Sequence, residues 1–167
     1  HMYMPNAGIE EARRAVARKV SKDEGIDVPP DNIVMTVGAA GGLNVILKAI
    51  LNKGEEVITP IPYFVEYKFY VHNFGGNLIP AETREDFSID VGVIEGLLNE
   101  KTKAVLINNP NNPSGVVYKR RDLEDLISLL DRKSKEFGGP IYLISDEPYR
   151  KIVYNGAEVA PLLSMYR

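Results

Sequence analysis

Apolar side chains recur at helical spacing near the start of the chain. Charged residues separate the members of this repeat, which are Ile9, Ala12, Val16 and Val20. A repeat of this kind places its members on one face of a helix. Gly25 follows the repeat, and a glycine at that point commonly ends a helix. We therefore predict an amphipathic first helix that ends at Gly25 and the prolines beyond it.

Short runs of branched and aliphatic residues alternate with helical patterns along the rest of the chain. The runs are residues 33–37, 56–59, 77–80, 103–107 and 141–145, and the helical patterns include residues 43–50, 91–98 and 121–137. Strands that are apolar on both faces and alternate with helices are typical of a parallel sheet covered on both sides. The pattern predicts an α/β fold with a mostly parallel sheet and helices on both faces. Ligands of such folds gather at the carboxyl ends of the strands.

Length and composition indicate a single domain. The chain has 167 residues, 44% of them hydrophobic, and shows no internal repeat, low-complexity segment or linker. We interpret residues 1–2, His1 and Met2, as the remnant of a cleaved tag, and residues 3–167 as one domain. No secretory signal precedes the first helix, and we expect the protein to be cytoplasmic.

Residue usage and charge exclude several kinds of site. The absence of cysteine excludes thiolate chemistry, and two histidines are too few to build a metal centre. The net charge of −3 comes from 20 basic and 23 acidic residues mixed along the chain. It does not create the one-signed field that nucleic acid or an anionic membrane surface needs. The mixed charge favours a small polar ligand instead. Asn44 and Lys48 interrupt the long apolar stretch at residues 34–51, so we also expect no membrane span.

Two of the strand ends lead into loops with more than one interpretation. The glycine-rich turn at residues 38–42 can present backbone N–H groups to a phosphate or carboxylate at a helix N-terminus. It can equally be a tight connection between a strand and a helix. Phe64, after the second run, could stack on a flat ligand or pack in the core.

Polar side chains follow the last two strands. The loop at residues 108–115 is rich in asparagine and stiffened by two prolines, so an amide side chain could be held toward a ligand oxygen. Asp146 follows a run that we expect to be a central, buried strand. A buried carboxylate needs a partner there, such as a protonated ring nitrogen or an arginine. Tyr149 adds a hydroxyl near the same point. Ordinary turns and a capping aspartate are the alternatives.

Taken together, these groups describe a pocket for one kind of ligand. An anion cradle, an aromatic ring, an amide, a carboxylate and a phenol suit a phosphorylated, planar heterocycle that can take up a proton. Pyridoxal 5′-phosphate has these properties.

Five segments of the chain resemble the class I and II aminotransferases, which are pyridoxal-phosphate enzymes of the aspartate aminotransferase fold. The segments are residues 3–8, 36–40, 62–64, 108–115 and 145–149, and they occur in the family's order over nearly the whole chain. The asparagine and proline loop, followed by Asp-Glu-Pro-Tyr, is the most specific pair. The resemblance implies that residues 3–167 are a partial, truncated large domain that binds pyridoxal phosphate.

The resemblance also implies how the cofactor is held. The backbone N–H groups of Ala39 and Ala40 would bind the phosphate, and the ring of Phe64 would stack on the pyridine ring. Tyr3 would reach the phosphate of a neighbouring subunit, because members of the family are homodimers with shared sites.

Three further residues would hold the polar groups of the pyridine ring. Asn112 and Tyr149 would bond the 3′-oxygen of the ring. Asp146 would pair with the protonated ring nitrogen and maintain the positive charge that makes the ring an electron sink.

The chain departs from the family's pattern in two ways. Position 40 is alanine where relatives often carry serine, threonine or lysine, which removes one contact to the phosphate. The family's Schiff-base lysine lies well after Asp146, and the chain ends at Arg167 before it; Lys151 is too near Asp146 to match. We therefore predict no catalytic residue in this chain, and a non-covalent cofactor site that is inactive alone.

The function expected from the resemblance is transfer of an amino group between an amino acid such as aspartate and a 2-oxo acid. In the family, further strands lie between residues 141–145 and 33–37, so we expect this chain to form a non-native oligomer or to show rearranged packing, with a displaced first strand. The alternatives are a related lyase or synthase with the same cofactor, and the cofactor-sensing effector domain of a transcriptional regulator. A module that binds another phosphorylated ligand is the third alternative.

Overall fold

The computed structural model describes residues 3–166, so the tag remnant proposed for His1 and Met2 lies outside the described residues. The backbone divides into two units, which are residues 1–43 with 161–167, and residues 44–160. The prediction of one domain over residues 3–167 stays a prediction.

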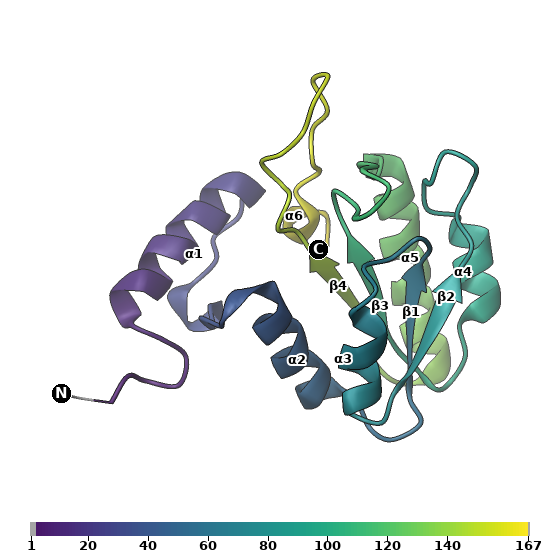
Figure 1. Ribbon diagram of the computed structural model, residues 1–167, viewed down its shortest axis with the longest axis horizontal. Coiled ribbons are helices and arrows are strands. Elements are labelled where there is room, and N and C mark those ends of the chain that lie inside the picture. The colour runs from purple at the N-terminus through teal and green to yellow at the C-terminus, as the bar shows by residue number, and fades with distance from the viewer. Residues whose placement is uncertain (1–2, 167) are drawn as a thin grey trace. The chain divides into compact units, whose positions relative to one another are not determined.

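The first unit is built on a long helix, as the apolar repeat predicts. This helix, α1, covers Glu10–Glu24 (Figure 1). Gly25 ends it in the left-handed conformation, with φ of 70°, and donates its N–H to the carbonyl of Ser21. The other elements are the 3-10 turn η1 (Pro30–Asn32), the helix α6 (Leu162–Met165) and the start of α2 (Gly38–Ile50), which continues into the second unit.

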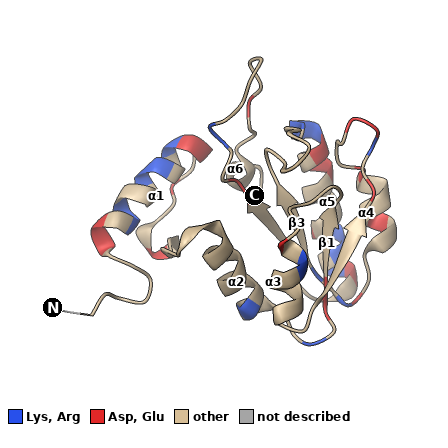
Figure 2. Cartoon of the chain, in the orientation of Figure 1, with Lys and Arg blue, Asp and Glu red and all other residues tan. Residues whose placement is uncertain are grey.

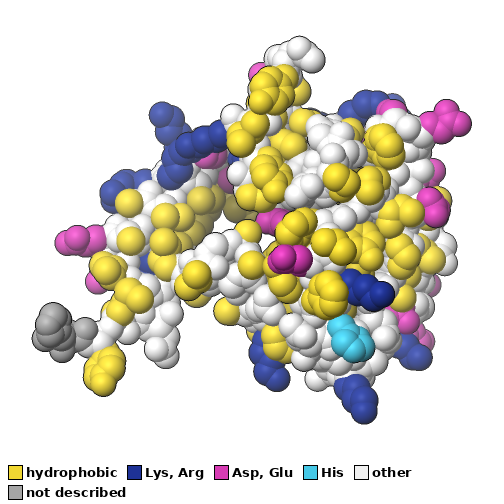
Figure 3. All heavy atoms as spheres, in the orientation of Figure 1, with side chains coloured by type: hydrophobic (Ala, Val, Ile, Leu, Met, Phe, Trp, Pro, Cys, Tyr) yellow, Lys and Arg dark blue, Asp and Glu magenta, His cyan; other side chains and the backbone are white. Residues whose placement is uncertain are grey.

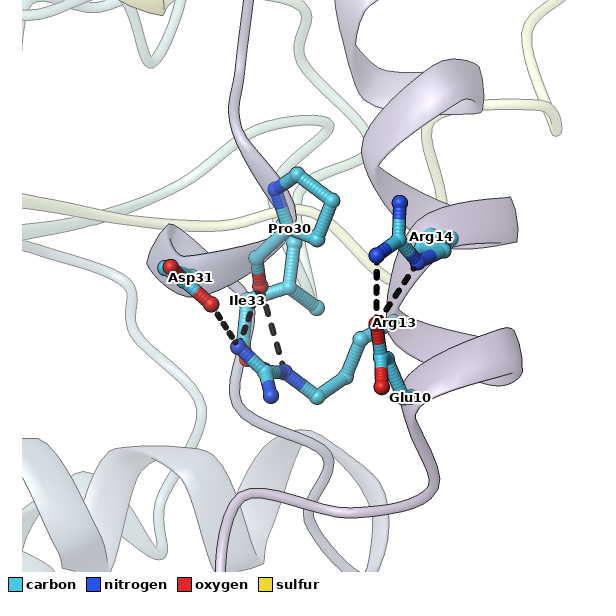
Figure 4. Close-up of polar contacts among 6 residues, drawn as sticks. All are labelled: Glu10, Arg13, Arg14, Pro30, Asp31 and Ile33. Atoms are coloured by element: carbon cyan, nitrogen blue, oxygen red, sulfur yellow. Dashed lines mark hydrogen bonds and ion pairs between the residues drawn. The ribbon is translucent and has the colours of Figure 1, made fainter.

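Arg13 ties the segment after α1 to that helix. Its guanidinium donates to the carbonyl of Pro30 at 2.7 Å and to that of Ile33 at 2.9 Å (Figure 4). It also pairs with Asp31 at 2.9 Å, and the Arg13 side chain is only 14% exposed. The next residue, Arg14, makes an exposed pair with Glu10 instead. Arg13 therefore anchors the chain that leads into α2.

The strand predicted at residues 33–37 is wrong. Ile33 has extended dihedral angles, with φ of −105° and ψ of 125°, but the four strands of the described residues form one sheet that excludes this segment. The N–H of Met35 donates to the carbonyl of Ala7 at 3.0 Å, and the carbonyl of Ile33 accepts from Arg13. Branched residues favour extended backbone, but a strand also needs a neighbouring chain to pair with.

Four parallel strands form the centre of the second unit (Figure 1). They are β1 (Glu56–Pro60), β2 (Asn77–Ala81), β3 (Thr102–Asn108) and β4 (Tyr142–Asp146). Their order across the sheet is β2-β1-β3-β4, and every pair is parallel. The predicted parallel α/β fold is confirmed. The inner strands β1 and β3 are buried along most of their length, as their continuous apolar runs predict.

Three helices connect these strands and cover the sheet. They are α3 (Tyr67–Asn73), α4 (Val91–Leu97) and α5 (Arg120–Phe137). The step from β1 to β2 runs one way across the sheet, and the steps from β2 to β3 and from β3 to β4 run the other way. Right-handed crossovers therefore put α3 on one face and place α4 with α5 on the other (Figure 1). Asp90 caps α4, and its side chain accepts from the N–H groups of Gly92 and Val93.

The core of the second unit lies between the sheet and these helices. Leu106 and Ile107 of β3 and Leu123 and Leu126 of α5 have no exposed surface. Charged residues lie mainly on the helices and loops, and both signs are interspersed along α1 and α5 (Figure 2).

β4 lies at the edge of the described sheet and not at its centre. It pairs with β3 on one side, and no strand of residues 3–166 pairs with its other side. Tyr142 is accordingly 41% exposed. The expectation of a central, buried strand at residues 141–145 is therefore wrong for this chain. Asp146 nevertheless stands at the carboxyl end of β4 and is half-buried.

Arg13→Met should loosen the segment that Arg13 holds. The carbonyls of Pro30 and Ile33 lose a charged hydrogen-bond donor in this variant. A loss of ~1.4 kcal/mol of local stability corresponds to a tenfold loss of protection from hydrogen exchange. We expect hydrogen exchange at the Asn32 and Ile33 amides to become about tenfold faster. Arg14→Met is the matched control and should leave both rates unchanged. Equal exchange rates in the two variants would contradict an anchoring role for Arg13.

Candidate functional site

The topology of the sheet points to one place for a ligand. The connection after β1 goes to one face of the sheet and the connection after β3 goes to the other. A crevice forms where neighbouring connections diverge in this way, at the carboxyl ends of the strands. The loops that follow β1, β3 and β4 all begin at this edge. They carry the predicted site residues of the second unit, which are Phe64, Asn112, Asp146 and Tyr149.

Asp146 is held at this edge by a tyrosine from another element. The hydroxyl of Tyr67, the first residue of α3, donates to Oδ2 of Asp146 at 2.6 Å. Burial raises the pKa of the Asp146 carboxyl, and the bond from Tyr67 acts in the opposite direction. Burial, and next the bond to Asp146, raise the pKa of Tyr67, so this phenol keeps its proton and stays a donor.

The backbone of Asp146 is joined to the end of β3. Asn108 stands opposite Asp146 in the register of the two strands. Its Nδ2 donates to the backbone carbonyl of Asp146 at 2.8 Å, and the N–H of Asn109 donates to the same carbonyl at 3.1 Å. These two bonds fix the backbone at the end of β4, and with it the position from which the Asp146 side chain extends.

A second polar pair lies in the loops after β3 and β4. Nδ2 of Asn112 donates to the hydroxyl oxygen of Tyr149 at 3.1 Å. Oδ1 of Asn108 accepts from the N–H of Asn112 at 2.5 Å, which links this pair to the end of β3. The predicted residues Asn112, Asp146 and Tyr149 therefore belong to one connected hydrogen-bond network that runs through Asn108.

The asparagine and proline loop is held rigid from within. Oδ1 of Asn111 accepts from the hydroxyl and the N–H of Ser114, at 2.7 and 3.2 Å. Oδ1 of Asn109 accepts from the N–H of Tyr118 at 3.0 Å. Burial raises the pKa of Tyr118 to about 12. These asparagines serve the loop, whereas Asn112 is half-buried and reaches Tyr149.

Phe64 joins the same group of side chains through an aromatic contact. Its ring packs edge-on against Tyr67, with 5.7 Å between the ring centroids and 79° between the planes. Tyr63 lies nearly parallel to Tyr67, with the centroids 6.4 Å apart. Phe64 is half-buried, so part of its ring remains open to solvent or to a ligand.

The other predicted residues lie in the first unit. Ala39 and Ala40 are exposed and form the first turn of α2, which contains no acidic residue. Gly38 begins that helix with φ of 68°, a left-handed conformation that glycine adopts readily. Tyr3 is fully exposed near the start of the chain.

Sequence reasoning missed the two residues that connect the site. Tyr67 lies three positions after Phe64, a spacing that brings two side chains together where a helix begins. That spacing was a usable signal for an aromatic contact, but it says nothing of Asp146, which is far away in the sequence. Asn108 looked like one of several turn asparagines, and only the strand register sets it opposite Asp146.

Other kinds of site find no support within residues 3–166. The described residues contain no group of His, Cys, Asp and Glu side chains able to hold a metal ion. His72 is exposed on the surface (Figure 3). None of the helices in this part of the chain is long and apolar enough to cross a membrane.

Comparison with known proteins gives a consistent result. An aspartate aminotransferase of Bacillus sp. (strain YM-2) is 37% identical over 158 residues, covering 93% of this chain and 39% of that protein. An aspartate/prephenate aminotransferase of Thermus thermophilus is 37% identical over 161 residues, covering 95% of this chain and 40% of the relative. A crystal structure of an aminotransferase from Eubacterium rectale matches with a TM-score of 0.96 and 41% identity, over 99% of this chain and 42% of the other.

The family model of the class I and II aminotransferases matches residues 1–166. The chain therefore belongs to this family, and the predicted resemblance is confirmed. Aminotransferases of these classes use pyridoxal 5′-phosphate. The chain spans about two fifths of the length of the relatives it matches.

Asp146→Asn should stabilise the protein at neutral pH. In the folded chain, burial raises the carboxyl pKa above its ordinary value of 3.8, so the ionised form costs stability once the pH exceeds that value. An amide carries no charge and can still accept from Tyr67. We expect Asp146→Asn to have a higher urea midpoint than wild type at pH 7. The two midpoints should be equal at a pH below the ordinary carboxyl pKa, where Asp146 is protonated in both the folded and the unfolded chain.

The exposed Asp125 on α5 provides the matched control for that experiment. Asp125→Asn makes the same charge change at an exposed position, and its urea midpoint should stay close to that of wild type. A gain of the same size in both variants would show that net charge, and not burial at position 146, is responsible.

Proposed function

We propose that this chain is part of a pyridoxal-phosphate-dependent aminotransferase and that its second unit provides much of the non-covalent cofactor site. The observation that carries this proposal is the connected network at the carboxyl edge of the sheet. It joins a carboxylate, an amide, a phenol and a half-buried aromatic ring that come from three different loops. The whole enzyme would transfer an amino group between an amino acid and a 2-oxo acid.

The donor set fits the polar atoms of the cofactor ring. Asp146 would accept from the protonated ring nitrogen, because an ionised carboxylate is the acceptor that a pyridinium N–H requires. When bound, the cofactor supplies a cationic ring that withdraws electrons from the α-carbon of the substrate. The half-buried position of Asp146 strengthens this pairing, since charges attract more strongly where water is partly excluded.

Asn112 and Tyr149 would hold the 3′-oxygen of the ring. The amide Nδ2 and the phenol hydroxyl can both donate to one oxygen, and the 3.1 Å between them shows that the two groups converge. The exposed part of the Phe64 ring would pack on the face of the pyridine ring.

We also infer that the first turn of α2 binds the cofactor phosphate. The N–H groups at the start of a helix point outward and favour an anion, and Ala39 and Ala40 are exposed there with no acidic residue in the turn. Tyr3, fully exposed, would serve the phosphate site of a second subunit in a homodimer.

We propose aspartate as an amino donor of the whole enzyme. The names of two relatives specify aspartate, and one of these also specifies prephenate. Lys151, five residues after Asp146, is exposed, and we do not assign it as the lysine that bonds the cofactor. We therefore propose that this chain by itself does not transaminate. A cytoplasmic location stays a prediction from the sequence.

Pyridoxamine 5′-phosphate is a suitable probe of this proposal. It carries an amine in place of the reactive aldehyde, so it cannot condense with surface lysines and reports the non-covalent site alone. Wild type should bind it saturably in a titration followed by cofactor fluorescence. Tyr149→Phe should weaken binding about threefold to tenfold, because one hydrogen bond to the ring oxygen is lost.

Tyr142→Phe is the matched control for this titration, since Tyr142 is an exposed residue at the opposite end of β4. Its dissociation constant should equal that of wild type. If wild type shows no saturable binding at millimolar probe, the proposed cofactor site is wrong.

We propose further that copies of this chain associate in solution. The outer edge of β4 lacks a strand partner among the described residues, and an unpaired edge invites pairing. Large apolar side chains are also exposed on the second unit, including Val65, Phe69, Ile152 and Tyr154, and many apolar side chains cover the face seen in Figure 3. Light scattering over a concentration series should give a mass above the 18.6 kDa of one chain. A constant mass of one chain would refute association.

A further inference from the structure

Tyr67 belongs to the hydrogen-bond network, but the proposed cofactor contacts give it no role. It is fully buried, and its hydroxyl reaches Asp146 from the start of α3. The bond crosses the sheet, because α3 follows β1 whereas Asp146 ends β4, and β3 lies between those strands. A buried phenol placed so far across the sheet needs a partner, and the carboxylate is the one it has.

The geometry of this bond indicates that it favours the ionised carboxylate. The 2.6 Å between Oη and Oδ2 lies in the range of hydrogen bonds from a hydroxyl to a charged oxygen. A donor that bonds the charged form stabilises it against the cost of burial. Tyr67 therefore offsets the effect of burial on Asp146.

The bond also sets the direction of the carboxylate. The hydrogen bonds of the described residues engage Oδ2 of Asp146 and leave Oδ1 unused. With Oδ2 held by Tyr67 and the backbone carbonyl held by Asn108, rotation of the carboxylate is restricted. The oxygen that remains available can then meet one ligand atom in one direction.

We propose that Tyr67 is a positioning residue for the cofactor, which acts through Asp146 by keeping its carboxylate ionised and its Oδ1 turned toward the cationic ring nitrogen. This inference rests on the proposed function. It assigns to Tyr67 no contact with substrate or cofactor.

The test compares two probes and two tyrosine variants. One probe is pyridoxamine 5′-phosphate, and the other is its 1-deaza analogue, in which a C–H group replaces the ring nitrogen. Tyr67→Phe removes the hydroxyl and keeps the ring that packs between Tyr63 and Phe64. Tyr70→Phe is the matched control, because Tyr70 lies one turn along the same helix and bonds Glu66.

Tyr67→Phe should weaken binding of pyridoxamine 5′-phosphate about tenfold, in line with the loss of a hydrogen bond to a charged group, and leave binding of the deaza analogue unchanged. Tyr70→Phe should change neither. A merely structural role would lower both affinities equally, and that outcome, like no change with either probe, overturns the inference while the proposed function stands.

A second measurement needs no cofactor and so separates failure of this inference from failure of the proposed function. The Asp146 carboxyl, identified in carbon NMR by its absence in Asp146→Asn, is titrated in wild type and Tyr67→Phe. The other titratable groups near the pair are the phenols of Tyr70, Tyr118 and Tyr149. We expect a higher carboxyl pKa in Tyr67→Phe, because the donor that favours the charged form is gone. An unchanged pKa overturns the inference whether or not the chain binds the probe.

Discussion

The burial of one carboxylate at the carboxyl edge of the sheet is the constraint around which this site is arranged. Asp146 ends β4 in a half-buried position, where an ionised group loses part of its hydration. The protein compensates in part with a buried phenol on its side chain and with two donors on its backbone carbonyl. A carboxylate held in this way is costly to the free chain and well prepared for a cationic ligand, which is a common compromise between stability and function.

The parallel topology explains how residues distant in sequence reach this carboxylate. Phe64 and Tyr67 follow β1, Asn112 follows β3, and Tyr149 follows β4. Parallel strands end at the same edge of the sheet, so each following loop contributes a side chain to the same region. The topology favours a ligand site between β1 and β3, because their connections leave toward opposite faces.

Rigidity at this edge of the sheet comes from polar side chains that bond within the protein. The side chains of Asn108, Asn109 and Asn111 satisfy backbone and side-chain donors within the loop after β3. Their bonds leave Asn112 as the asparagine that bonds Tyr149. In the first unit, Arg13 has a comparable part, since it holds the segment before α2 through backbone carbonyls. Such contacts limit how far the ligand-binding groups can move, which lowers the entropy cost of binding.

Local pattern and turn chemistry predicted the helices α1, α2, α4 and α5, the four paired strands, the strand-end loops and the glycine stop of α1. The short helix α3 was not among the predicted helices. The sequence motifs also indicated the family, through their resemblance to the class I and II aminotransferases. Residues 33–37 and the edge position of β4 were mispredicted, since pairing depends on which chain segment lies alongside. The bond from Tyr67 to Asp146 was also beyond sequence reasoning, as 79 positions separate the two residues. Tertiary structure alone decided that partnership, because strand register and crossover handedness, which no local pattern encodes, bring the two side chains into hydrogen-bond range.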